Sequence, residues 1–167
     1  MQNILIGVIA DTHDRLPMVD KAVKRLNEEK VEIVLHAGDY VAPFVAAHLK
    51  QLKADLIGVF GNNDGDRELL RKKFSDLGAE IRGKFAEVMI EGLRIGMVHG
   101  EENDLLQSLI NVGGYDIIIH GHTHEAKTYQ KGKTMVINPG EVCGYLTGKS
   151  TVAILDTKTL NVKIIPL

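Results

Sequence analysis

The fold is decided near the start of the chain, where the sequence reads ILIGVIADTH at residues 4–13. The segment Ile4–Ala10 is apolar and rich in β-branched side chains, which is typical of a strand buried on both faces. It is too short to span a membrane, and no basic residues precede it as they would in a secretory signal. We therefore expect a buried strand that brings the polar residues Asp11, Thr12 and His13 to the edge of a sheet.

The same alternation continues outward through the first half of the chain. Apolar strand-like segments recur, and amphipathic segments with helical spacing lie between them. The further strands are expected at Val31–His36 and Asp55–Phe60, and the helices around Val19–Leu26 with Pro17 at its start, from Pro43 to Leu52, and over Asp66–Leu77 before Gly78. Strands alternating with helices predict a parallel sheet covered by helices.

The second half of the chain is richer in strands. Glu91-Gly92 is a good two-residue turn between two apolar segments, and two more strand pairs follow later. The expected elements are strands at Phe85–Ile90, Leu93–Val98, Ile117–His120, Tyr129–Gln130, Thr134–Ile137, Thr151–Leu155 and Val162–Ile165, and a helix over Asp104–Val112. Together the two halves predict a layered α/β sandwich of two sheets with outer helices.

The composition is that of an ordinary globular chain, with 167 residues of which 44% are hydrophobic, and we expect one domain over residues 1–167. The formal net charge of -2 provides no basic field for nucleic acid or an anionic membrane. We therefore expect no membrane partner, and nucleic acid only as a substrate. Cys143 is the single cysteine, so no intrachain disulfide is possible and a cytoplasmic location is expected.

Five of the predicted strands end in polar loops that contain glycine and metal-ligand side chains. These loops are Asp11-Thr12-His13, His36-Ala37-Gly38-Asp39, Gly61-Asn62-Asn63-Asp64, His99-Gly100 and His120-Gly121-His122-Thr123-His124. Ligands bind beyond the carboxyl ends of strands in open α/β sheets, so the five loops are expected to converge. Carboxylate, imidazole and amide ligands without thiolate favour Mn, Fe, Ni or Zn. The ligands outnumber the needs of one ion, which favours two ions that share a carboxylate.

These motifs, in this order, resemble the calcineurin-like metallophosphoesterases over residues 1 to about 155. Asn138-Pro139-Gly140-Glu141 and the segment Gly144–Gly148 resemble the small archaeal and bacterial phosphodiesterase branch of that superfamily. The resemblance implies a four-layer α-β-β-α sandwich, in which two mixed β-sheets are flanked by helices.

The resemblance also implies roles for individual residues. Asp11, His13, Asp39 and His124 would hold one divalent ion, and Asp39, Asn62, His99 and His122 would hold the second, with Asp39 bridging the two. Mn is the expected metal, with Ni, Fe or Zn as alternatives. A hydroxide between the ions, held beside Asp39, would attack a small phosphodiester, so no protein nucleophile is needed.

The sequence departs from the family pattern at one position. Most of the wider family has a histidine after the metal-binding asparagine, whereas this chain has Asn63. An amide can contact a phosphate oxygen but cannot act as a general acid near neutral pH. We therefore predict a phosphate contact by Asn63, modest turnover and a preference for diesters with good leaving groups. In the family, the residue matching Asp64 orients that histidine, so its role here is left open.

Other polar residues have plainer interpretations. His48 fits a surface position, Cys143 fits a small buried side chain, and His36 and His120 fit structural positions behind the ligands. Glu141 is left open between a structural role and a role in supporting a ligand.

Two further functions remain open. A subunit of the eukaryotic retromer coat resembles this branch and serves mainly as a platform for protein interactions, so this chain could be a non-catalytic scaffold. A phosphomonoesterase would differ only in substrate. A homo-oligomer is possible, and the sequence does not decide it.

Overall fold

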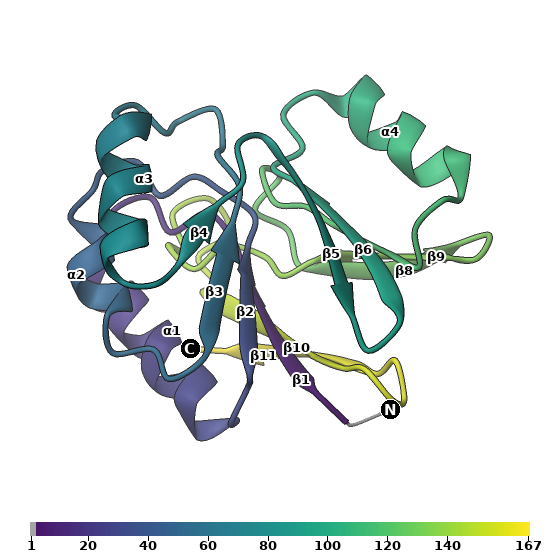
Figure 1. Ribbon diagram of the computed structural model, residues 1–167, viewed down its shortest axis with the longest axis horizontal. Helices are drawn as coiled ribbons and strands as arrows, with labels where there is room; N and C mark the ends of the chain where they lie inside the picture. The colour runs from purple at the N-terminus through teal and green to yellow at the C-terminus, as the bar shows by residue number, and fades with distance from the viewer. Residues whose placement is uncertain (1–2) are drawn as a thin grey trace.

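The computed structural model describes residues 3–167 as two β-sheets packed face to face, with helices on both outer sides (Figure 1). The first sheet has six strands in the order β11-β10-β1-β2-β3-β4, and the second has five in the order β5-β6-β7-β9-β8. Both sheets contain parallel and antiparallel pairs. The predicted four-layer sandwich with two mixed sheets is therefore confirmed.

Most of the elements lie where the sequence predicts them. The strands are β1 (Leu5–Ile9), β2 (Ile33–His36), β3 (Asp55–Gly58), β4 (Glu80–Ile81), β5 (Phe85–Ile90), β6 (Leu93–Val98), β7 (Ile117–Ile119), β8 (Lys127–Lys131), β9 (Thr134–Asn138), β10 (Thr151–Asp156) and β11 (Val162–Pro166), and the helices are α1 (Leu16–Glu28), α2 (Val45–Leu49), α3 (Arg67–Asp76) and α4 (Asn103–Val112). The helix expected from Pro43 to Leu52 is shorter than predicted, and the two-residue strand β4 was not expected.

Strand β1 contributes side chains to both faces of the first sheet. Ile6 and Val8 point into the core between the sheets, and Ile9 packs on the helix side. Gly7 also faces the helices, where a Cβ atom would lie only 2.6 Å from Cδ2 of Leu26. A glycine in the middle of this strand therefore allows α1 to pack closely against the sheet.

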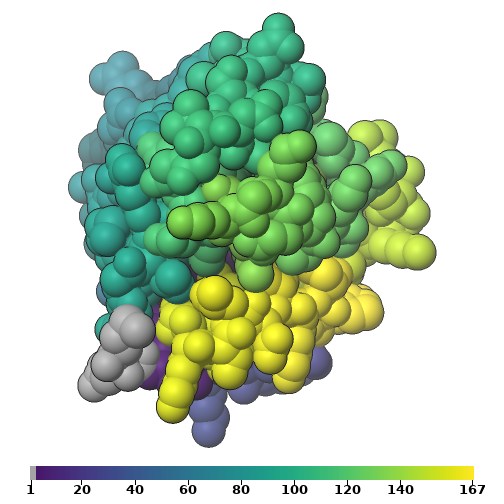
Figure 2. All heavy atoms as spheres, turned by 90° about the vertical axis from the view of Figure 1, so that its right-hand side faces the viewer, coloured from purple at the N-terminus to yellow at the C-terminus, as the bar shows by residue number. Residues whose placement is uncertain are grey.

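Three apolar layers hold the sandwich together. One lies between helices α1 to α3 and the first sheet, and a second fills the space between the sheets. The third, smaller layer packs α4 onto the second sheet through Leu106 and Ile110. In Figure 2, α4 and the second sheet, in green, are stacked above the yellow C-terminal strands of the first sheet. Within residues 3–167, no helix combines the length and apolar character needed to cross a membrane.

Backbone hydrogen bonds join the loops that follow the strands. The amide of Asp11 donates to the carbonyl of Gly38, and the amide of His13 donates to the carbonyl of Asp39, both at 3.0 Å. In the second sheet the amide of Gly121 donates to the carbonyl of His99 at 2.8 Å. These bonds bring the polar loops to one edge of the sandwich, as the order of the strands predicts.

Candidate metal centre

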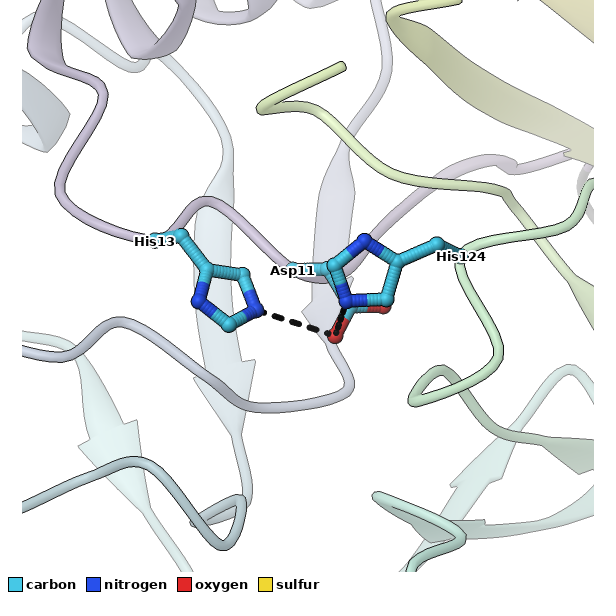
Figure 3. A group of neighbouring side chains, drawn as sticks. All are labelled: Asp11, His13 and His124. Carbon is cyan, nitrogen blue, oxygen red and sulfur yellow. Dashed lines mark ion pairs between the residues drawn. The ribbon is translucent and has the colours of Figure 1, made fainter. Parts of the chain in front are cut away.

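Two buried carboxylates lie at the middle of the converging loops. Asp11 follows β1 and Asp39 follows β2, and their exposed fractions are 0% and 1%. Histidine rings surround them. Nε2 of His13 lies 3.7 Å from Oδ1 of Asp11 and 3.2 Å from Oδ2 of Asp39. Nε2 of His124 lies 3.5 Å from the same Asp11 oxygen, so the two rings approach one carboxylate from separate segments (Figure 3).

The second sheet contributes two more histidines. Nε2 of the fully buried His99 lies 3.1 Å from Oδ2 of Asp39 and 3.8 Å from Oδ1 of Asp11. Its Nδ1 lies 2.8 Å from the carbonyl of Ala37, so Nδ1 carries the proton and Nε2 faces the carboxylates with its lone pair. The ring of His122 lies 5.2 Å from the ring of His99, and the backbone amide of His122 donates to Asp11 at 3.1 Å.

Several of these atoms are buried without a hydrogen-bond partner among the described residues. They are Oδ1 of Asp11, Nε2 of His13 and Nε2 of His99. A buried polar atom without a partner costs about 1–3 kcal/mol, so such a cluster needs a reason. Ligand atoms of Asp11, His13 and His124 lie within 4.8 Å of one another, as do those of Asp11, Asp39 and His99. Carboxylate and imidazole groups that converge in this way fit divalent cations.

The electrostatics of the cluster agree with this interpretation. The neighbouring carboxylates of Asp11 and Asp39 raise the pKa of His13 to about 9. Burial opposes ionisation of Asp39, but the neighbouring rings of His13 and His99 hold the pKa of this carboxyl well below its usual range. The cluster therefore stabilises positive charge beside the carboxylates, which a metal ion would supply in place of a proton.

Asp64 has a clear role in this structure. Its carboxylate accepts hydrogen bonds from the backbone amides of Gly61 at 2.7 Å, Val41 at 2.8 Å and Asp39 at 3.1 Å. Burial raises the pKa of Asp64, and these amides oppose that rise. Asp64 thus joins the loops after β2 and β3, which answers the question that the sequence left open.

The two asparagines of the third loop behave differently. Asn63 donates to both oxygens of Asp39, from its backbone amide at 2.9 Å and from Nδ2 at 2.8 Å. Both asparagines are exposed in the same turn. The structure brings Asn63 into contact with the carboxylate that the sequence assigns as the bridge, and it places Asn62 beside Asn63 in the same exposed turn.

Glycines let the loops approach one another at two positions. A Cβ atom on Gly61 would lie 2.1 Å from Oδ1 and 2.6 Å from the backbone nitrogen of Asp39. A Cβ atom on Gly121 would lie 2.7 Å from Cβ of Ala10 and 2.8 Å from Oδ2 of Asp11. Only residues without a side chain fit so close to the two carboxylates.

The backbone of the site is strained. Residues other than glycine seldom adopt positive φ angles, because the side chain then crowds the backbone. Five predicted ligands do so, namely Asp11 at 53°, His13 at 40°, Asp39 at 63°, His122 at 68° and His124 at 64°. Such conformations cost on the order of 1–3 kcal/mol each and concentrate at functional sites.

The remaining histidines lie behind or outside the cluster. Nδ1 of His36 accepts from the amide of Gly38 at 3.1 Å, and its Nε2 lies 3.3 Å from Oγ1 of Thr12. Nδ1 of His120 lies 3.0 Å from the carbonyl of Gly121, and burial lowers the pKa of this ring. His48 pairs with Asp20 at 2.7 Å on the surface. All three have the structural positions that their place in the sequence suggests.

Glu141, like Asp64, is a polar residue of the site whose role the sequence left open. It follows β9, is fully buried, and its Oε2 lies 2.5 Å from Nδ1 of His124. The Asn138-Pro139-Gly140-Glu141 motif was the only signal that placed it near the metal-binding loops.

A two-sheet α/β sandwich that gathers buried carboxylates and imidazoles at its strand ends has the arrangement of a metal-binding enzyme site. A family model described as the calcineurin-like phosphoesterase superfamily domain matches residues 4–160. The chain belongs to the calcineurin-like phosphoesterase superfamily, and it is accordingly a metal-dependent phosphoric ester hydrolase.

Individual relatives agree with this assignment. The chain is 44% identical over 154 residues to the phosphodiesterase MJ0936 of Methanocaldococcus jannaschii, covering 92% of this chain and 93% of the relative. A solved structure described as a novel archaeal phosphodiesterase superposes with a TM-score of 0.94 at 42% identity, covering 98% of this chain and all of the other. Vps29 of Chaetomium thermophilum superposes with a TM-score of 0.72 at 20% identity, covering 98% of this chain and 97% of that one, which shows a shared fold alone.

Proposed function

We propose that this protein is a phosphodiesterase that works with two divalent metal ions, Mn being the expected metal and Ni, Fe or Zn the alternatives. The observation that carries the proposal is the set of buried ligand atoms around Asp11 and Asp39 that have no hydrogen-bond partner within residues 3–167. The close similarity to relatives named phosphodiesterases supports the same activity.

The ligands divide between two ions. Asp11, His13, Asp39 and His124 would hold one ion, and Asp39, Asn62, His99 and His122 would hold the other. The position of Asp39 supports its bridging role, because its Oδ2 lies 3.2 Å from Nε2 of His13 and 3.1 Å from Nε2 of His99. One carboxylate oxygen thus lies between a ring of the first group and a ring of the second.

Divalent ions held by these residues would supply a water of lowered pKa and positive charge for the phosphoryl oxygens. Asp39, as the shared ligand, would position that water. Asn63 adjoins Asp39 and is suited to donate a hydrogen bond to a phosphate oxygen. Cys143 is not suited to act as a nucleophile, since burial and the neighbouring Glu141 raise the pKa of its thiol to about 12.

A small phosphodiester with a good leaving group is the proposed substrate. Asn63 cannot protonate a leaving oxygen, and an alkoxide is difficult to expel without a general acid. An aryl oxide leaves without that help. Nucleic acid would interact with this protein only as a substrate, through its own phosphodiester bonds.

The test is an assay of bis(p-nitrophenyl) phosphate hydrolysis by metal-free protein supplied in turn with Mn, Ni, Mg and Zn. We expect metal-dependent release of p-nitrophenol. The Asp39→Asn variant should lose more than about 100-fold in kcat/KM, since even outer partners of metal ligands are worth about 10–100-fold. The Asp20→Asn variant is the matched control, because Asp20 pairs with His48 on the surface. Full activity of Asp39→Asn, or no hydrolysis with any metal, would overturn the proposal.

A non-catalytic scaffold is the second candidate, favoured by the amide of Asn63 at the position of the family's histidine and by the fold shared with Vps29. The same assay separates the two, since a scaffold would bind partners without releasing p-nitrophenol. A phosphomonoesterase would hydrolyse p-nitrophenyl phosphate faster than the diester.

A further inference from the structure

The carboxylate of Glu141 is surrounded by hydrogen-bond donors. Its Oε1 accepts from the amide of Leu146 at 3.0 Å, the amide of Thr147 at 2.6 Å and the hydroxyl of Thr147 at 2.8 Å. Its Oε2 faces Nδ1 of His124 at 2.5 Å, Sγ of Cys143 at 3.0 Å and the amide of Tyr145 at 3.0 Å. A carboxylate with this many donors is held in one position.

The contact with His124 determines how that ring presents itself to the metal centre. Because Glu141 can only accept, Nδ1 of His124 must carry the proton. Nε2 then has a free lone pair, and it lies 3.5 Å from Oδ1 of Asp11 in the metal centre. Metal-binding histidines commonly have their other ring nitrogen bound to a carboxylate in this way.

The other contacts of Glu141 shape a surface loop. Residues Gly144–Gly148 lie between β9 and β10 outside any helix or strand, and three consecutive amides turn inward to the carboxylate. The side chains of Tyr145 and Leu146 remain 59% and 73% exposed. The segment between β9 and β10 protrudes at the right edge of Figure 2, in yellow-green.

A contact from the metal-binding side also reaches this loop. Arg15, two residues after His13, donates to the carbonyl of Cys143, and its guanidinium lies 5.4 Å from the centre of the Tyr145 ring. The amide of Cys143 donates to the carbonyl of Asp11 at 3.0 Å. The loop Gly144–Gly148 is thus attached directly beside the first metal-ligand segment.

We propose that Glu141 is a positioning residue that links the metal ligand His124 to the loop Gly144–Gly148 at the rim of the metal centre. The proposal rests on the proposed function for the ligand role of His124. One carboxylate fixes the tautomer and direction of the ring and at the same time orders the loop. Metal binding and loop order are therefore coupled, and each strengthens the other.

The coupling can be measured without any variant. In the wild-type protein, binding of Mg or Zn should fix His124, hold Glu141 more firmly, and slow hydrogen exchange at the amides of Tyr145, Leu146 and Thr147. The exchange rates are measured by NMR on metal-free and metal-loaded protein. Unchanged exchange at these three amides would overturn the proposal.

The Glu141→Gln variant tests the link from the other direction. Within residues 3–167, every hydrogen-bonding partner of the Glu141 carboxylate is a donor. The amide group of glutamine would therefore point its own hydrogens at either His124 or the loop. We expect the affinity for one ion, measured by calorimetric titration with Zn, to fall about 10–100-fold, while the second ion binds as before. Exchange at the loop amides should increase.

The matched control is Glu125→Gln. Glu125 follows His124 directly, but its side chain is exposed, and its backbone amide donates to Oγ1 of Thr123 at 3.4 Å. Equal metal affinity of Glu141→Gln and Glu125→Gln would overturn the proposal. If the protein binds metal but hydrolyses no diester, the proposed function fails while this inference stands, and if the wild-type protein binds no divalent ion, both fail.

Discussion

His36 shows what burial does to a single residue in this protein. It is fully buried, its ring packs 4.1 Å from the ring of Tyr40, and its Nδ1 accepts from the amide of Gly38 at 3.1 Å. Burial, followed by the electrostatic effect of the nearby His99, lowers the pKa of His36 to about 3 from 6.5. The ring therefore stays neutral in the folded protein at every pH where the enzyme is expected to work.

This neutral ring makes stability depend on pH. Below pH 6.5 the unfolded chain binds a proton at His36 that the folded protein does not bind, so the free energy of unfolding falls as the pH falls toward 3. Between pH 7 and pH 5 we expect a loss of about 2 kcal/mol from this group. Urea unfolding of metal-free protein measures it, and His36→Asn should remove that part of the slope. An identical pH dependence in the variant would contradict this assignment.

Asn63 leads to a prediction about catalysis. Introducing a histidine by Asn63→His would restore a general acid, a group that is typically worth about 10²–10⁴-fold. We expect faster hydrolysis of diesters with poor leaving groups, little change for p-nitrophenyl diesters, and a new alkaline limb in the pH–rate profile, where the rate falls as the imidazolium loses its proton. An unchanged rate toward the poor leaving group would show that Asn63 does not account for the predicted preference.

At the scale of elements, the close contact between the loops after β2 and β3 can be tested. Gly61→Ala would place a Cβ atom 2.1 Å from Oδ1 of Asp39, so that carboxylate must move. We expect a loss on the order of 100-fold in kcat/KM, because a displacement of about 1 Å can cost that much. Gly65→Ala is the matched control, since a Cβ there has no neighbour within 4 Å in the part of the chain that the structure describes. Equal activity of the two variants would contradict the argument.

The elements were predictable where the signal is local. The hairpin at Glu91-Gly92 was predicted with its boundaries, because both residues have the positive φ angles that such a turn requires, 49° and 81°. The strand β4 was not predicted, since its two residues carry no periodicity and depend on pairing with β3. The convergence of the five loops followed from the strand-end rule, which needs only the order of elements.

Parts of the site could not be predicted for a different physical reason. The donors around Glu141 are mostly backbone amides, and an amide has no signature in the amino-acid sequence. The same holds for Asp64, which binds three amides from two loops. The direction of the Asn63 side chain toward Asp39 depends on the loop conformation, which only the folded chain defines.

At the scale of the whole molecule, the proposed ions connect the two sheets. Asp11 and Asp39 follow strands of the first sheet, and His99 and His124 follow strands of the second. An ion that binds only the folded state at 100 times its dissociation constant adds about 2.7 kcal/mol to the free energy of unfolding. We expect the melting temperature in calorimetry to rise with Mn and to fall with a chelator. The melting temperature of Asp39→Asn should change little with metal. A wild-type melting temperature that is the same with and without metal would contradict the proposal that ions connect the two sheets.

The left-handed backbone at five of the ligand positions affects which segments of the molecule unfold first. Chain segments held in unfavourable conformations gain from local opening, whereas the apolar layers between and outside the sheets have nothing to gain until they separate completely. Stripped of its cations, the protein should therefore first be cut by a protease at the segments around His13 and His124. The two packed sheets would stay folded after the metal-binding loops at their edge had been cleaved.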